Sequence, residues 1–413
     1  MTGEPSAGVR ARTVAIDDPG DLVARLPRRQ GLAWLRRDEG MVAGGEVIRR
    51  EFASIAEADE WWERYAAGIA VENDLPGVFG TGPLAFGSFT FDPHHTAQRS
   101  VLVVPQWILG RRGRQHWLTR VSSGEEPSTE LPARDSAPER PGQVSYGDGA
   151  MSGPAWESVV ADAVRRIRNG DLAKVVLARD LIATTPDDID YRWLVAQLAS
   201  AYQLCWTYHV DGLVGASPEM LVRRENGLVT SRVLAGTIQR TADEEADRAL
   251  AARLSRSSKD LGEHDYAVAS VADALTPLCS GMNVPDAPYV LELPNVFHLA
   301  TDVAAAAKPS VSSLTLATAL HPSAAVCGTP TDAARLLIRE LEGLDRGRYS
   351  GPVGWVDAHG DGEWAIALRC GRIEGNTAQL YAGCGVVADS NPEAELMESM
   401  AKLVPMRDAL EAD

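Results

Sequence analysis

Apolar and polar residues recur along the chain at helical and strand spacings, and the first third predicts short helices among strands. Segment 54–69 (SIAEADEWWERYAAGI) has the helical period and begins at Ser54, a favoured N-cap residue. Segments 31–37, 101–110 and 114–121 are rich in aliphatic and aromatic residues, as strands are, and a GRRG turn separates the last two.

The rest of the chain carries sharper patterns. The helical period occurs in five segments: 155–170, 190–203, 244–278, 331–344 and 392–410. Strand patterns occur in five others: 174–184, a hairpin at 219–237, 289–303, 351–373 and 377–387. We expect Thr331 and the pair Ser390–Asn391 to cap helices, and the longest helical segment to break near Gly262. Long hairpins mixed with helices favour an α+β fold with an antiparallel sheet over a parallel wound sheet.

Composition divides the 413 residues into three parts. Residues 1–120 form a strand-rich N-terminal part. Residues 121–153 are poor in large apolar side chains and rich in Ser, Pro, Glu and Gly, which predicts a surface loop or linker. Residues 154–413 hold most of the sharper patterns, and we expect them to form the catalytic region.

Charge and cysteine content exclude several classes of protein. The chain has 57 Asp plus Glu against 40 Lys plus Arg, a net charge of −17, which argues against a nucleic-acid partner. The chain contains no run of ~18 apolar residues, so no membrane-spanning helix is expected. The N-terminus lacks the apolar region of a secretory signal. The five cysteines have no metal-ligand spacing, so we expect reduced thiols in a cytoplasmic protein without a membrane partner.

Lysine is rare in this chain. Only four of the 40 basic residues are lysines: Lys174, Lys259, Lys308 and Lys402. A desolvated lysine can release its proton, whereas arginine cannot. The bias therefore singles out these positions for acid–base chemistry.

Carboxylates on two predicted helices indicate a cation site. Glu395, Glu398 and Lys402 are spaced to share one helical face, and the alternative is a solvated salt-bridge stripe. Glu263 lies on a second helix next to His264, a residue that is unusual on an exposed helix. Two helices that present carboxylates to one cleft would suit a hard cation such as Mg²⁺.

Three more residues indicate chemistry in the same half of the chain. Lys174 begins a strand, Glu219 opens another, and Arg369 alternates with small residues that leave room for a carboxylate ligand. The respective alternatives are an edge lysine, an exposed turn carboxylate and a structural ion pair.

Histidine and glycine positions complete the candidate set. His298 is either a site residue or a satisfied core histidine, and Gly383 with Gly385 indicates either close ligand approach or a bulge. The chain has no Walker A loop, GxGxxG spacing or GxSxG elbow, which argues against kinase and hydrolase functions.

These residues fall in a series of motifs in one order: KVVLAR at 174–179, SPE at 217–219, LAGT at 234–237, EH at 263–264, FHLATDV at 297–303, HPSAAVCGTP at 321–330, GPVGWVDAHGDGEWAIALRC at 351–370 and YAGCGVVADSNPEAELMESMAK at 381–402. On these motifs the chain resembles the chorismate-utilising enzymes. This family includes the isochorismate, salicylate, anthranilate and aminodeoxychorismate synthases.

The resemblance implies a large α+β fold, a two-sheet antiparallel sandwich with outer helices, to which residues 1–120 add strands. It implies a cleft for chorismate and Mg²⁺. By motif, Lys174 would activate water and Glu219 would protonate the departing ring hydroxyl. The resemblance implies Mg²⁺ ligands at Glu263 and Glu398, with Glu395 beside them. It implies substrate contacts at Gly236, His298, Ala325, Arg369, Gly383 and Lys402.

Two positions separate branches of the family. Members that deliver ammonia lack a lysine at the position of Lys174, or carry one in the motif that here includes Ala235. Water is therefore the expected nucleophile, and no amidotransferase partner is expected. The stretch at 351–370 most resembles isochorismate synthases. The open alternatives are a salicylate synthase, which adds pyruvate elimination, and a non-catalytic chorismate-binding protein.

Overall fold

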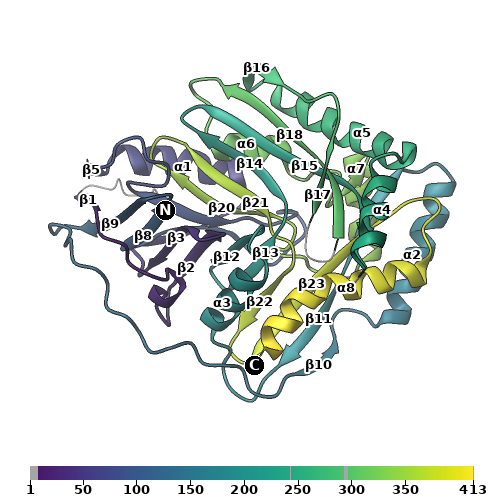
Figure 1. Cartoon of the computed structure of the whole chain (residues 1–413), viewed down its shortest axis with the longest axis horizontal. Coiled ribbons are helices and arrows are strands. Elements are labelled where there is room, and N and C mark those ends of the chain that lie inside the picture. Colours follow the sequence, from purple (N-terminus) through teal and green to yellow (C-terminus); the bar gives the residue numbers. More distant parts are fainter. Residues whose placement is uncertain (1–7, 242, 293–295, 413) are drawn as a thin grey trace.

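Two twisted antiparallel sheets lie face to face and helices cover their outer sides (Figure 1). The computed structural model describes residues 8–241, 243–292 and 296–412, without the side chains of Thr237, Lys259 and Glu263. Within these residues only the β1–β5 pair is parallel. The predicted α+β class with two antiparallel sheets is confirmed.

Thirteen of the described strands form the larger sheet: β1 (Val9–Ala15), β2 (Leu32–Arg36), β3 (Glu39–Gly44), β5 (Ala70–Asn73), β8 (Trp107–Arg112), β9 (Gln115–Ser123), β10 (Ser145–Asp148), β11 (Lys174–Thr184), β12 (Trp206–Val210), β13 (Leu213–Ser217), β19 (Gly328–Thr329), β22 (Cys370–Glu374) and β23 (Thr377–Val386). Its order is β10-β11-β23-β22-β13-β12-β2-β3-β8-β9-β1-β5, and β19 pairs with β11. Strands from the N-terminal 120 residues thus continue the same sheet as those near the C-terminus.

Ten described strands form the smaller sheet: β4 (Ile48–Phe52), β6 (Leu84–Ser88), β7 (Ser100–Val104), β14 (Met220–Glu225), β15 (Leu228–Gln239), β16 (Cys279–Asn283), β17 (Tyr289–Glu292), β18 (Val296–Ala307), β20 (Pro352–Asp357) and β21 (Gly362–Ile366). Its order is β16-β18-β15-β14-β21-β20-β6-β7-β4, and β17 pairs with β18. Buried aromatic side chains such as Trp34, Phe86, Tyr208 and Trp355 belong to one hydrophobic cluster that joins the two sheets.

Helices α1 (Ile55–Ala67), α5 (Ser258–Leu275) and α6 (Ser313–Leu320) contact the ten-stranded sheet, as does α4 (Glu244–Leu254). Helices α2 (Gly153–Arg168), α3 (Tyr191–Ala201), α7 (Thr331–Leu341) and α8 (Pro392–Glu411) contact the thirteen-stranded sheet. The C-terminal half of α8 packs with α3 through Leu403, Met406 and Leu194. No helix in the described residues is long and apolar enough to cross a membrane.

Local capping agrees with most of the predicted boundaries. The Ser54 hydroxyl accepts a hydrogen bond from the Glu57 N–H at the start of α1, and Asn391 caps α8 by accepting from the Ala394 N–H. The five cysteines are buried free thiols, as predicted. The segment predicted as a loop at 121–153 contains the short strand β10, which pairs with β11.

The predicted break in the long helical segment exists but lies earlier in the chain than Gly262, and the prediction of Thr331 as a cap is wrong. The helical segment 244–278 breaks at residues 255–257, because the Ser257 hydroxyl accepts from the Asp260 N–H and starts a new helix there. Gly262 lies inside α5, and the helix continues through it without a break. At α7 the N-cap is Pro330, whose φ of −64° suits the extended cap conformation and whose carbonyl accepts from the Ala334 N–H, so Thr331 is the first helical residue.

Two of the places where the chain passes from one sheet to the other are neighbours in space. The segment predicted as one meander splits, because β20 and β21 belong to the smaller sheet and β22 and β23 to the larger one. The passage from β13 to β14 likewise changes sheets at Glu219. Ser217 Oγ donates to the Ile366 carbonyl at 2.6 Å, and the Ile366 N–H donates to the Glu219 carbonyl at 3.1 Å. The two crossings are therefore held together, and both lie at the cavity described next.

Candidate active site

A cavity of about 760 Å³ opens between the two sheets and the N-terminal half of α8. It is lined by strands of both sheets, by α5 and by α8, and by the segment before β19. Every predicted site residue except Glu263 lines it: Lys174, Glu219, Gly236, His298, Ala325, Arg369, Gly383, Glu395, Glu398 and Lys402. Glu263 belongs to α5, and its side chain lies outside the described part of the structure.

Glu219 stands at one of the two sheet crossings, immediately before β14. Burial raises the pKa of its carboxyl from an ordinary 4.5 to about 7, although the positive charges of Lys174, Arg369 and Lys402 oppose this rise. Desolvation disfavours the charged form of an acid, so this carboxyl keeps a substantial protonated population at neutral pH. It is suited to donate a proton.

Lys174 begins β11 and lies across from β23, whose Val386 pairs with Val175. The side chain occupies the space above Gly385, since a β-carbon built there would lie 2.9 Å from Cε and 3.5 Å from Nζ of Lys174. The amine therefore lies inside the cavity. The alternative interpretation, an edge lysine, would have placed it at an exposed edge of the sheet.

Arg369 stands at the second sheet crossing, between β21 and β22. Its φ is 49°, a left-handed conformation that is uncommon for residues other than glycine. The prediction that Arg369 continues the alternation of β21 is therefore wrong, because the strand ends at Ile366. Among the residues that the structure describes, no carboxylate forms an ion pair with its guanidinium, which does not support the alternative of a structural ion pair.

His298 lies on β18 opposite the bulge that Gly236 makes in β15. Burial first, and the charges of Arg369 and Lys402 second, lower the pKa of His298 to about 4. The imidazole is neutral at physiological pH and can serve as a hydrogen-bonding group, not as a cation. Gly236 has a φ of +77°, and a β-carbon there would lie 3.2 Å from Cβ of Asp260.

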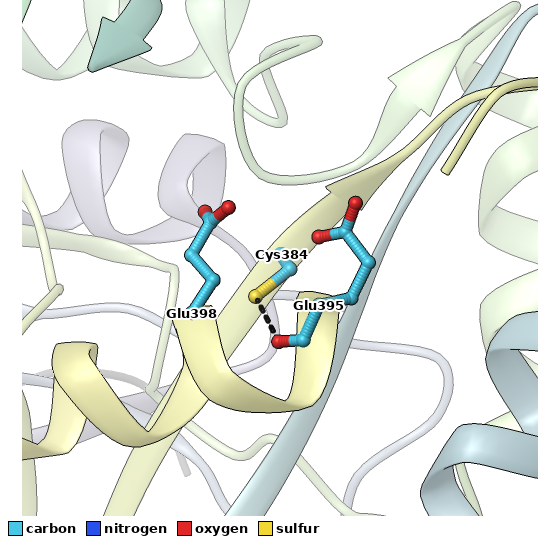
Figure 2. Close-up of side chains that lie close together, drawn as sticks. All are labelled: Cys384, Glu395 and Glu398. Atoms are coloured by element: carbon cyan, nitrogen blue, oxygen red, sulfur yellow. Dashed lines mark hydrogen bonds between the residues drawn. The ribbon is translucent and has the colours of Figure 1, made fainter. Parts of the chain in front are cut away.

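Glu395 and Glu398 project from one face of α8 beside Cys384 (Figure 2), and both line the cavity, although the Glu398 side chain remains 43% exposed. Ligand atoms of Cys384, Glu395 and Glu398 lie within 4.8 Å of one another. Ser390 Oγ donates to Glu395 Oε1 at 2.7 Å, while Glu395 Oε2 is buried and has no hydrogen-bond partner within the described structure. Burial raises the pKa of Glu395.

Lys402 connects the acidic face to the neighbouring strand. Its Nζ lies 2.6 Å from Glu398 Oε1 and donates to the Gly383 carbonyl at 2.7 Å. Together with Lys174 and Arg369 it places three cationic side chains around one cavity, in a chain whose net charge is −17. Five acidic residues also line the cavity, so an anionic ligand would be held by individual cations such as Arg369 and not by an overall positive charge.

The donor set fits a hard divalent cation. Glu395 and Glu398 supply carboxylate oxygens, one of which lacks any partner among the described groups. Burial raises the pKa of Cys384 to about 12, so its sulfur is a protonated thiol that donates to the Glu395 carbonyl and not a thiolate ligand. Oxygen donors without thiolate suit Mg²⁺ better than zinc.

Several lining residues were not among the predicted site residues. Asp260 on α5 and Tyr349 line the same cavity. Gly385, predicted together with Gly383 to mark either close ligand approach or a bulge, lines the cavity and provides the space for Lys174. The spacing of three between Asp260 and Glu263 on one helix could have identified Asp260.

A buried ion pair supports the walls of the cavity. Arg346 pairs with Glu342 and donates to the carbonyls of Val176 at 2.7 Å and of Val326 at 2.8 Å. These bonds tie β11 to the segment that carries Ala325. The second unusual residue of α5, His264, is fully buried and its Nε2 lies 2.7 Å from Thr301 Oγ1, so it fastens α5 to β18.

Comparison with known proteins agrees with this geometry. A family model described as "Chorismate binding enzyme" matches residues 34–411. Isochorismate synthase MenF of Bacillus subtilis is 33% identical over 383 residues, which cover 86% of this chain and 80% of that protein. Isochorismate synthase DhbC of the same organism is 42% identical over 270 residues, which cover 62% of this chain and 68% of the relative.

The solved structure of MenF, the menaquinone-specific isochorismate synthase of Escherichia coli, has the same fold, with a TM-score of 0.82 at 24% identity. The match covers 99% of this chain and 96% of that one. The motifs, the two-sheet fold and the matched family agree over nearly the whole length, and the chain belongs to the family of chorismate-binding enzymes.

Proposed function

We propose that this protein interconverts chorismate and isochorismate by adding water to the ring and expelling a ring hydroxyl. The observation that carries the proposal is the meeting of Lys174, Glu219 and Arg369 in one cavity at the crossings between the sheets. A base, an acid and a carboxylate-binding cation are the groups that this reaction needs. The names of the curated relatives support the same activity.

Lys174 accepts a proton from the attacking water, and Glu219 donates a proton to the departing hydroxyl. Both groups are required because water is a poor nucleophile and hydroxide is a poor leaving group. Burial raises the pKa of Glu219 to about 7, which keeps its proton available at neutral pH. Lys174 must be neutral when water attacks, because only the neutral amine can accept a proton.

Arg369 binds one carboxylate of the substrate through its planar guanidinium. Gly383 and Gly236 leave room for the ring, and neutral His298 offers a hydrogen bond to the ligand. Ala325 and Lys402 line the same cavity and complete the substrate pocket.

Glu395 and Glu398 hold Mg²⁺, with Glu263 as a further ligand on the basis of its motif. When bound, Mg²⁺ neutralises a substrate carboxylate and helps to fix its position. The unpartnered Oε2 of Glu395 supports this assignment. Because water is the nucleophile, no amidotransferase subunit is required.

The test is to incubate purified protein with chorismate and Mg²⁺ at neutral pH and to separate the products. We expect isochorismate together with residual chorismate, and the same mixture from isochorismate as the starting material. Rapid formation of pyruvate and salicylate as main products would assign a salicylate synthase. Chorismate binding without any turnover would assign a non-catalytic protein.

We also propose a cytoplasmic location. The five cysteines are free thiols, as they are in a reducing compartment.

A further inference from the structure

A second, smaller cavity lies behind Glu219. It has a volume of about 40 Å³ and shares Glu219, Leu234 and Ala325 with the main cavity. Its other walls come from α5, from the strands β14 and β15, and from the segment after α6. Glu219 is therefore a wall residue of both cavities.

The side cavity is lined by Glu219 and also by residues of α5 that lie nearer to solvent. Two residues of α5, one helical turn apart, line the side cavity. Ala267 is half-buried and Ser270 is exposed. A water molecule needs ~10–15 Å³ of such space, so this volume holds at least one. Such a water molecule would border Glu219, which is a wall residue of both cavities.

Ser323 supplies a polar group in this cavity. Its hydroxyl oxygen is buried and has no hydrogen-bond partner among the described residues, and the residue lines the side cavity. A buried hydroxyl without a partner is costly unless water satisfies it. Because a hydroxyl donates and accepts at once, it can pass a proton along a chain of water molecules.

We propose that the side cavity is the path by which Glu219 regains its proton, and that Ser323 is the relay residue within it. This inference rests on the proposed acid role of Glu219. It assigns a function to a hydroxyl and a cavity that the reaction itself does not use.

The proton balance of one turnover requires that Glu219 be protonated again before the next, and the side cavity would allow this while the main cavity is occupied. Lys174 gains a proton when water adds, and Glu219 loses one when the ring hydroxyl leaves as water. The next turnover needs Glu219 protonated and Lys174 neutral. With substrate or product in the main cavity, a solvent proton reaches the Glu219 carboxylate through Ser323 and cavity water, and Lys174 returns its proton to solvent after the product leaves.

The first test fills the side cavity from α5. Ala267→Leu adds volume to this cavity alone, and Ala269→Leu, at an exposed position on the same helix, is the matched control. In Ala267→Leu we expect kcat for isochorismate formation to fall by about tenfold, less than the ~10²-fold minimum for loss of the acid itself. The solvent deuterium isotope effect on kcat should rise, and KM for chorismate should not change.

The second test removes the hydroxyl without adding volume. Ser323→Ala should lower kcat and raise the isotope effect in the same direction, and it keeps the inference testable if Ala267→Leu does not fold. Values of kcat and isotope effect equal to those of Ala269→Leu in both variants would overturn the relay. A higher KM with an unchanged isotope effect would also overturn it, because the cavity wall would then only position substrate.

Failure of the proposed function is distinguishable from failure of the relay. Absence of isochorismate formation by the unmodified protein would overturn both. Normal isochorismate formation with no response of kcat or isotope effect in the variants would overturn the relay alone.

Discussion

Gly385 provides the space in which Lys174 lies: a β-carbon at Gly385 would approach within 2.9 Å of Lys174 Cε. This contact is closer than real Cβ atoms show, so an alanine would displace the lysine side chain. We expect Gly385→Ala to lower kcat at least tenfold with little change in chorismate binding. The control is Gly147→Ala on β10, the strand that pairs with β11. Gly147 has open space around it, so this variant should leave kcat unchanged.

The base itself should be sensitive to its ability to lose a proton. Lys174→Ala should lower kcat by ~10²–10⁴-fold, the usual range for a positioned acid or base. Lys174→Arg keeps the charge but cannot act as a base, so it should be similarly inactive. Both variants should still bind chorismate in a calorimetric titration. Near-normal turnover by Lys174→Arg would contradict the assigned role.

Glu219 predicts an alkaline limb in the pH profile. Its pKa is raised by burial to about 7, and the acid must be protonated to act. We therefore expect kcat/KM to fall as the pH rises through about 7. Glu219→Gln should be inactive at every pH. If this variant kept some activity and its pH profile still fell at alkaline pH, the fall would belong to another group.

The same raised pKa couples Glu219 to folding stability. A carboxyl whose pKa is higher in the folded state binds its proton more tightly there, so its contribution to stability is lost as the pH rises from about 4.5 to about 7. The free energy of unfolding of Glu219→Gln, relative to that of the wild type, should therefore be about 3 kcal/mol higher at pH 8 than at pH 4. Chemical denaturation of both proteins at the two pH values measures these free energies. If the variant and the wild type differed by the same amount at both pH values, the carboxylate would not be buried.

The acidic face of α8 predicts metal dependence. Glu398→Gln and Glu395→Gln should each weaken Mg²⁺ binding at least tenfold, because each removes a charged oxygen donor. Titration calorimetry with Mg²⁺ measures this without reference to turnover, and EDTA should abolish activity of the wild type. Glu393→Gln, at an exposed position on the same helix, should bind Mg²⁺ normally. Unchanged Mg²⁺ affinity in both variants would remove this pair from the metal site.

Arg369 should act on substrate binding. Arg369→Ala removes a guanidinium that has no carboxylate partner in the described structure, and KM should rise by about tenfold or more, since a charge-assisted hydrogen bond contributes ~1.5–3 kcal/mol. Arg369→Lys keeps the charge without the bidentate fork and should lie in between. Arg372→Ala, which breaks an exposed pair with Glu374, is the control. A fall of kcat alone would place Arg369 in the chemical step.

The sequence by itself determined most element types and several boundaries. The β-branched run at 174–184 is the strand β11 at those residues, and the Ser54 cap starts α1. Hydrophobic period and capping chemistry are local, so they can be recognised without knowing the partner of each element. The family motifs also identified residues that the fold brings to one cavity, as Glu219 and Lys402 illustrate.

Only the tertiary structure decided how these elements meet. Periodicity shows that β21 and β22 are buried but not that they belong to different sheets, and the crossing between them gives Arg369 its left-handed backbone. The room that Gly385 leaves for Lys174, and the side cavity behind Glu219, arise between segments far apart in sequence. Burial of a carboxyl, and hence its raised pKa, depends on all the surfaces packed around it, so no local pattern could have predicted it.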